Sequence, residues 1–142
     1  MGFLDKLMGK KDEYPPLPSD HPVKTRLQSD MKGLETLVQE VSDPLEVVPA
    51  GKATYVFIGK PPKQFGMAWV EGQEVKDFKK LGREKGMTSL DLKPVMEKIR
   101  TAYENNSPDE RYSMKIGERN IVVAPASVLG GEVESAIEAA SS

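Results

Sequence analysis

The sequence predicts an α+β protein in which an antiparallel sheet of about four strands, in the order β-β-α-β-β-α, is covered by helices on one face. Three observations predict it. Residues 52–58 (KATYVFI) are rich in β-branched and aromatic residues, as in an interior strand. Gly117-Glu118 separates two strand-like segments, as a two-residue hairpin turn does. Apolar residues at three- and four-residue steps follow each pair of strands, which indicates helices.

Length and composition suit one domain with an arm. The chain has 142 residues, of which 38% are hydrophobic, and a formal net charge of −2. We expect an amphipathic helix and proline-rich arm over 1–18, a helix over 19–44 and the α+β domain over 45–142. Cysteine is absent and histidine occurs once, which excludes disulfide scaffolds, cysteine-based zinc sites, thiol nucleophiles and clustered-histidine metal sites. No catalytic, cofactor-binding or metal-binding residues are predicted.

The first eleven residues predict a short amphipathic helix with lysines beside its apolar stripe. A helix of fewer than about 12 residues does not persist alone in water, so it needs a surface to lie on. That surface is either a membrane or partner protein, or the chain's own domain; the first is favoured. The predicted docking residues of this helix are Phe3, Leu4, Leu7, Met8, Lys10 and Lys11.

Residues 12–18 (DEYPPLP) predict an extended arm, because three of these seven residues are proline. The arm is interpreted mainly as a spacer, with the alternative that it is itself a ligand for a partner. The residues that would then dock are Tyr14, Pro15, Pro16, Leu17 and Pro18. A helix is predicted from Pro22 to Val41, either packed on the sheet or projecting from it. Residues 45–48 follow as a short edge strand.

The first predicted hairpin carries a candidate ligand or partner face. Phe65, Met67 and Trp69 alternate with small residues, so one face of their strand is bulky. A bulky face is more often core than binding site. After the hairpin, Val75, Phe78 and Leu81 predict a helical turn or two, and Thr88 or Ser89 begins a stronger helix.

The second hairpin predicts its own register. A type II′ turn at Gly117-Glu118 sets Met114 opposite Ile121 and Tyr112 opposite Val123, which keeps apolar partners on one face. A final short helix is expected after Gly130-Gly131, with its apolar residues on one stripe.

Basic residues in the 76–85 segment form a candidate anion patch, made of Lys76, Lys79, Lys80 and Arg83. Acidic residues interleave with them, so a mixed, solvated surface is the favoured interpretation. Nucleic-acid binding through this segment is a weaker alternative, because no recognised nucleic-acid motif accompanies it.

The leading functional hypothesis is a non-enzymatic cytoplasmic interaction protein. It would be an adaptor or accessory subunit, docking through its N-terminus on a membrane or membrane protein complex. The longest apolar runs are about four residues, far below the roughly 18 that span a bilayer, so the protein is expected in the cytoplasm and, when docked, at the inner face of the membrane. The alternative is a small ligand-binding or regulatory domain, and an enzyme with carboxylate or lysine chemistry ranks third.

Overall fold

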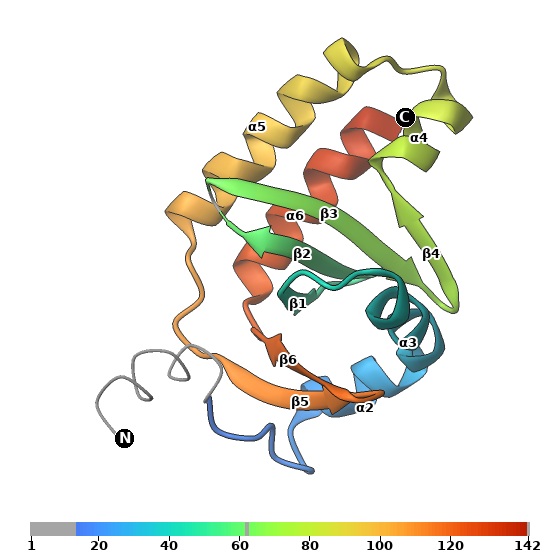
Figure 1. Cartoon of the computed structure of the whole chain (residues 1–142). Helices are drawn as coiled ribbons and strands as arrows, with labels where there is room; N and C mark the ends of the chain where they lie inside the picture. Colours follow the sequence, from blue (N-terminus) through green and yellow to red (C-terminus); the bar gives the residue numbers. More distant parts are fainter. Residues whose placement is uncertain (1–13, 62, 142) are drawn as a thin grey trace.

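The computed structural model describes residues 14–61 and 63–141, so the predicted N-terminal helix and its docking residues lie outside the described part. The described chain forms a six-stranded sheet in the order β4-β3-β2-β1-β6-β5, with helices on both faces (Figure 1). The strands are β1 (Leu45–Pro49), β2 (Thr54–Lys60), β3 (Gln64–Glu71), β4 (Glu74–Asp77), β5 (Tyr112–Ile116) and β6 (Arg119–Val123). The helices are α2 (Pro22–Ser29), α3 (Met31–Glu40), α4 (Phe78–Lys85), α5 (Ser89–Asn105) and α6 (Ser127–Ser141).

The α+β class is confirmed, but the sheet has six strands and is mixed. The pair β1 and β6 is parallel, and every other neighbouring pair is antiparallel. β1, predicted at an edge, lies in the centre between β2 and β6. Its successive residues Val47 and Val48 belong to the cores on opposite faces of the sheet, so this strand has no face for water. Val75, predicted in a helical turn, instead belongs to the short edge strand β4.

Helices cover both faces of the sheet, not one as predicted. α4, α5 and α6 pack on the face that carries Phe57 and Trp69. α2 and α3 pack on the opposite face, where Leu27 and Leu34 are buried against β-strand residues such as Val56. The helical segment before β1 therefore packs on the sheet and does not project from it.

The helix predicted from Pro22 to Val41 is two helices, separated at Asp30. The side chain of Asp30 is buried, accepts a 2.6 Å hydrogen bond from Oγ1 of Thr54 on β2, and lies 3.4 Å from Nε of Arg26. Asp30 has φ −106° and ψ 10°, outside the helical region. The hydrogen bond between the Asp30 side chain and β2 stabilises this interruption of the helix. The spacing of apolar residues alone does not reveal the interruption.

Both predicted hairpins are present, and the predicted register of the second is confirmed. In the first, Phe57 pairs with Met67 across β2 and β3. In the second, Met114 pairs with Ile121, Tyr112 pairs with Val123, and Gly117 has the positive φ of 63° that its turn requires. Of the two predicted caps, Thr88 and Ser89, it is Thr88 that caps α5, with reciprocal hydrogen bonds to Asp91.

The last helix begins at Ser127, earlier than predicted, and includes both glycines. A Cβ on Gly130 would lie 2.8 Å from the carbonyl oxygen of Pro49, so α6 crosses β1 at a distance that only glycine permits. Within residues 14–61 and 63–141, no helix combines the length and the hydropathy that crossing a bilayer requires.

Candidate functional site

The proline-rich arm lies along the outer edge of β5. Pro16 forms a parallel bridge with Ser113. The amide of Leu17 donates to the carbonyl of Ser113, and the amide of Ser113 donates to the carbonyl of Pro15, both at 2.9 Å. The Ser113 hydroxyl donates to the carbonyl of Tyr14 at 3.0 Å. The arm is thus a short added strand attached at one residue of β5.

Leu17 anchors this added strand. Its side chain is 7% exposed and belongs to the core beneath α2 and α3. Burial of a leucine side chain contributes about 1.5–3 kcal/mol, and the neighbouring prolines lower the entropy cost of ordering the arm because they restrict the unfolded chain. This side chain and the hydrogen bonds at Ser113 hold the arm on β5.

This arrangement corrects one part of the predicted docking surface. Leu17 fills the protein's own core, so in this structure it is not available to a partner. Pro15, Pro16 and Pro18 remain exposed, and Tyr14 is half-buried. Phe3, Leu4, Leu7, Met8, Lys10 and Lys11 fall outside the described residues.

The predicted ligand or partner face is core. Met67 and Trp69 are 4% and 3% exposed, and Phe65 is half-buried against the same core. Trp69 packs edge-on against Phe78 of α4, with ring centroids 5.4 Å apart. These three side chains therefore do not form an exposed face, because residues of α4 and α5 pack on them.

One side of Trp69 nevertheless reaches a cavity of about 320 Å³, which also brings two residues of the predicted anion patch together. Lys76 and Lys80 line it, but Lys76 bonds Glu71 at 2.9 Å and Lys80 bonds Glu74 at 2.7 Å. The charges of these two lysines are thus balanced by carboxylates. Lys79 and Arg83 are exposed on α4 and do not line it.

Tyr55 lies in the wall of the same cavity. Burial, and then the nearby carboxylate of Glu134, raise the pKa of the Tyr55 phenol. Its hydroxyl lies 3.4 Å from Oε2 of Glu134, which also accepts a 2.7 Å bond from the amide of Lys52. The phenol stays protonated at neutral pH and can donate a hydrogen bond. Its raised pKa makes it unsuited to act as a general base.

A buried polar cluster that sequence analysis missed joins β1, α5 and the segment before β5. Glu46 on β1 is 8% exposed and accepts from the Tyr103 hydroxyl at 2.7 Å and from Nε of Arg111 at 2.8 Å. Burial and the carboxylate of Glu46 raise the pKa of Tyr103 to about 12. Every oxygen of this carboxylate has a partner within the fold, which indicates a structural cluster.

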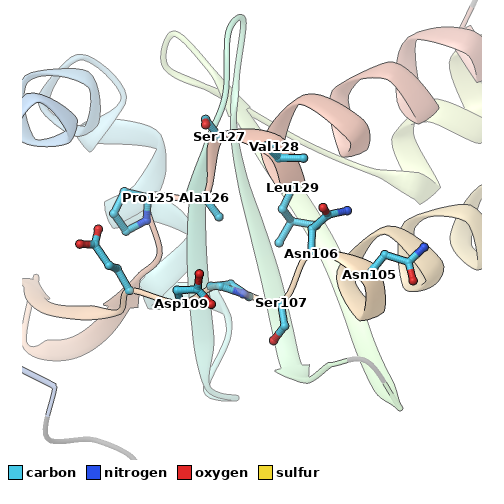
Figure 2. Close-up of a pocket in the computed structure, with 11 residues that line it drawn as sticks. Asn105, Asn106, Ser107, Asp109, Pro125, Ala126, Ser127, Val128 and Leu129 are labelled. Carbon is cyan, nitrogen blue, oxygen red and sulfur yellow. The ribbon is translucent and has the colours of Figure 1, made fainter.

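Another cavity, of about 650 Å³, lies where the loop after α5 faces the start of α6 (Figure 2). Asn106 and Ser107 line one side of it, and Ser127 and Val128 line the other (Figure 2). Its Asp109 and Glu110 belong to the same loop. It is a wide, polar cavity, and its described lining residues do not form an arrangement that indicates a particular reaction or ligand.

The single histidine serves the fold. Nδ1 of His21 accepts a 3.1 Å hydrogen bond from the amide of Val23, so His21 caps α2. Across the described ranges, no group of three or more His, Cys, Asp or Glu side chains is placed to hold a metal ion.

The β5 edge, with its arm, is the candidate functional site. Comparisons with protein-family models, with curated proteins and with solved structures give no match.

Proposed function

We propose that this protein is a non-enzymatic adaptor or accessory subunit that docks on a membrane-associated protein complex through its N-terminal residues. The observation that carries the proposal is the attachment of the arm to β5 at Ser113. It fixes the point from which the docking segment leaves the domain.

The fixed arm limits how far the domain can lie from its partner. Leu7 precedes Tyr14 by seven residues, and an extended chain spans at most about 3.3–3.6 Å per residue. A partner that holds Leu7 is therefore within about 25 Å of the β5 edge. A long flexible linker would allow a larger distance between the domain and its partner. The short arm therefore suits a subunit that is held at a fixed position on a complex.

The residue types of the docking segment suit an anionic apolar surface. Phe3, Leu4, Leu7 and Met8 supply apolar contacts, and Lys10 and Lys11 supply positive charge. Such a segment binds only weakly alone, because a few buried side chains barely offset the ordering cost. A second contact from the anchored domain would add to the affinity without a stronger anchor.

The test is retention of the full chain on native membranes, compared with a Leu4→Asp/Leu7→Asp variant. The proposal expects the unmodified chain to co-purify with a membrane complex from gently solubilised cells and to pellet with the membranes. The variant should lose both by about tenfold or more, because two apolar contacts become charges. A truncation should begin at Tyr14, not later, because Leu17 belongs to the core.

The matched control is Leu90→Asp/Val128→Asp. These two side chains are 79% and 60% exposed on the domain, so the control adds the same charge without touching the N-terminus or the core. It should bind as the unmodified chain does. Equal retention of all three proteins, each with a cooperative thermal unfolding transition, would reject the proposal.

A second candidate function, small-ligand binding, rests on the cavity at Trp69. That cavity places an indole, the Tyr55 phenol and the Lys76 ammonium around one space. A ligand bound there would raise the unfolding temperature as its concentration rises, and Lys76→Met should remove the shift. A metabolite screen with no shift in the unmodified protein would reject this candidate.

A further inference from the structure

The β5 edge binds the extended arm through backbone pairing at Ser113 and through one buried side chain, that of Leu17. Backbone pairing between β5 and the described arm residues uses the carbonyl of Pro15 and the amide of Leu17, on either side of Pro16. The nitrogen of residue 16 takes no part, so proline is tolerated there and blocks a further strand from pairing outside it. The leucine that follows supplies the buried side chain. The arm thus shows which chemistry this edge accepts, namely extended backbone with a proline before a buried aliphatic residue.

The edge continues beyond the point where the arm leaves it. A cavity of about 380 Å³ borders Leu17 and runs on to Lys115 and Asn120. Its lining among the described residues includes Lys24 and Lys115 and no carboxylate. The arm does not follow this direction, because the amide of His21 bonds back to the carbonyl of Pro18 and α2 begins at Pro22.

We propose that this edge is a peptide-binding groove for another protein, occupied in this structure by the chain's own arm. We define the β5 groove by Lys24, Ser113, Met114, Lys115 and Asn120. Its partner is an extended proline–leucine segment that runs parallel to β5 and continues with acidic residues. The proline and leucine take the places of Pro16 and Leu17, and the acidic residues approach Lys24 and Lys115.

The partner segment competes with the arm for the same hydrogen-bonding groups and the same apolar site on β5. Within residues 14–18, three hydrogen bonds and one buried side chain hold the arm, so a segment with the same contacts can replace it. The arm has the advantage of a short tether, which corresponds to a millimolar effective concentration. The described arm residues 14–18 carry no carboxylate, so contacts between acidic residues and the two lysines give a partner the means to overcome that advantage.

The test uses the full chain and synthetic peptides. In the Leu17→Asp variant, the arm can no longer fill the apolar site. The fluorescent peptide acetyl-EYPPLTEE-amide should bind this variant at least about tenfold more tightly than the unmodified chain, because the competing arm is removed. The same peptide with aspartate in place of leucine should not bind. Fluorescence anisotropy gives the dissociation constants.

Charge reversal tests the acidic requirement. The peptide acetyl-EYPPLTKK-amide should bind Leu17→Asp about fivefold more weakly than the acidic peptide, as expected for two exposed charge pairs. Adding Lys24→Glu and Lys115→Glu should reverse this preference. Ser113→Pro, which removes the amide that pairs with the arm, should abolish binding of both peptides.

The outcomes separate the possible occupants. If circular dichroism shows that Leu17→Asp is unfolded, a folded Leu17→Ala chain takes its place. A folded variant that binds no peptide overturns the proposal. Concentration-dependent dimerisation without peptide binding also overturns it and assigns the groove to a second copy. None of these variants changes Leu4 or Leu7, and peptide binding is measured without membranes, so a negative result here does not decide the N-terminal docking proposal.

Discussion

The hydroxyl of Tyr103 donates a 2.7 Å hydrogen bond to Oε1 of Glu46, 57 residues away in sequence. This bond joins α5 to the central strand β1. The other carboxylate oxygen accepts from Nε of Arg111 at 2.8 Å. A buried carboxylate is tolerated here because each of its oxygens has a donor, one of them charged.

Glu46→Ala should lower the free energy of unfolding by about 2–3 kcal/mol, because it leaves the partly buried Arg111 guanidinium and the Tyr103 hydroxyl without their acceptor. Urea denaturation measures this change. The control is Glu74→Ala, which removes the exposed ion pair with Lys80 and should change stability by at most about 0.5–1 kcal/mol. Equal effects of the two substitutions would contradict a structural role for the cluster.

Alkaline pH should weaken the fold partly through Tyr103. Burial and Glu46 raise the pKa of this phenol to about 12 from an ordinary value of 10.0. The folded state therefore holds the proton more tightly than the unfolded state. The stability that this gives is fully present below about pH 10 and is lost as pH rises toward about 12. The difference in unfolding free energy between the unmodified protein and Tyr103→Phe should shrink across this range. A pH-independent difference would show that the phenol titrates alike in both states.

Leu17→Ala should cost less than an ordinary core leucine substitution. Complete loss of arm docking sets the upper limit, because the arm can leave β5 while the rest of the domain stays folded. We expect about 1 kcal/mol, compared with about 2–5 kcal/mol for Leu27→Ala, where the side chain is fully buried in α2. Chemical denaturation of both variants checks this. A cost as large as that of Leu27→Ala would mean that the arm folds together with the domain as one unit.

Gly130 and Gly131 offer a matched pair within α6. A Cβ at Gly130 would lie 2.8 Å from the Pro49 carbonyl oxygen, so Gly130→Ala should lower stability by about 1–3 kcal/mol despite its better helix propensity. A Cβ at Gly131 meets nothing within 4 Å, so Gly131→Ala should raise stability by about 0.5–1 kcal/mol. Thermal unfolding followed by circular dichroism distinguishes the two. Similar effects would mean that α6 shifts away from β1 at little cost.

Much of the candidate site lay beyond prediction from the sequence. Pro16 could be recognised as part of an extended arm, because proline restricts its own backbone. That Leu17 is core could not, because its neighbours come from helices and strands that are remote in the chain. The Phe65, Met67 and Trp69 face was correctly identified as bulky, but the choice between core and binding face stayed open, since the pattern does not show what covers it.

Local sequence by itself determined the features that depend on residues a few positions apart. These include the Gly117 turn, the register that sets Met114 opposite Ile121, and the Thr88 cap of α5. Each is decided by backbone geometry and by hydrogen bonds within one turn or hairpin, so its signal is contained in a short stretch of sequence.

Only the tertiary structure decided how these pieces meet. It placed β1 in the centre of the sheet, parallel to β6, and it broke the first long helix at Asp30 through a bond to Thr54. It also paired Glu46 with Arg111 and set the arm against Ser113. The physical reason is the same in each case: the stabilising partner is brought near only when the whole chain has folded, and a local pattern carries no information about it.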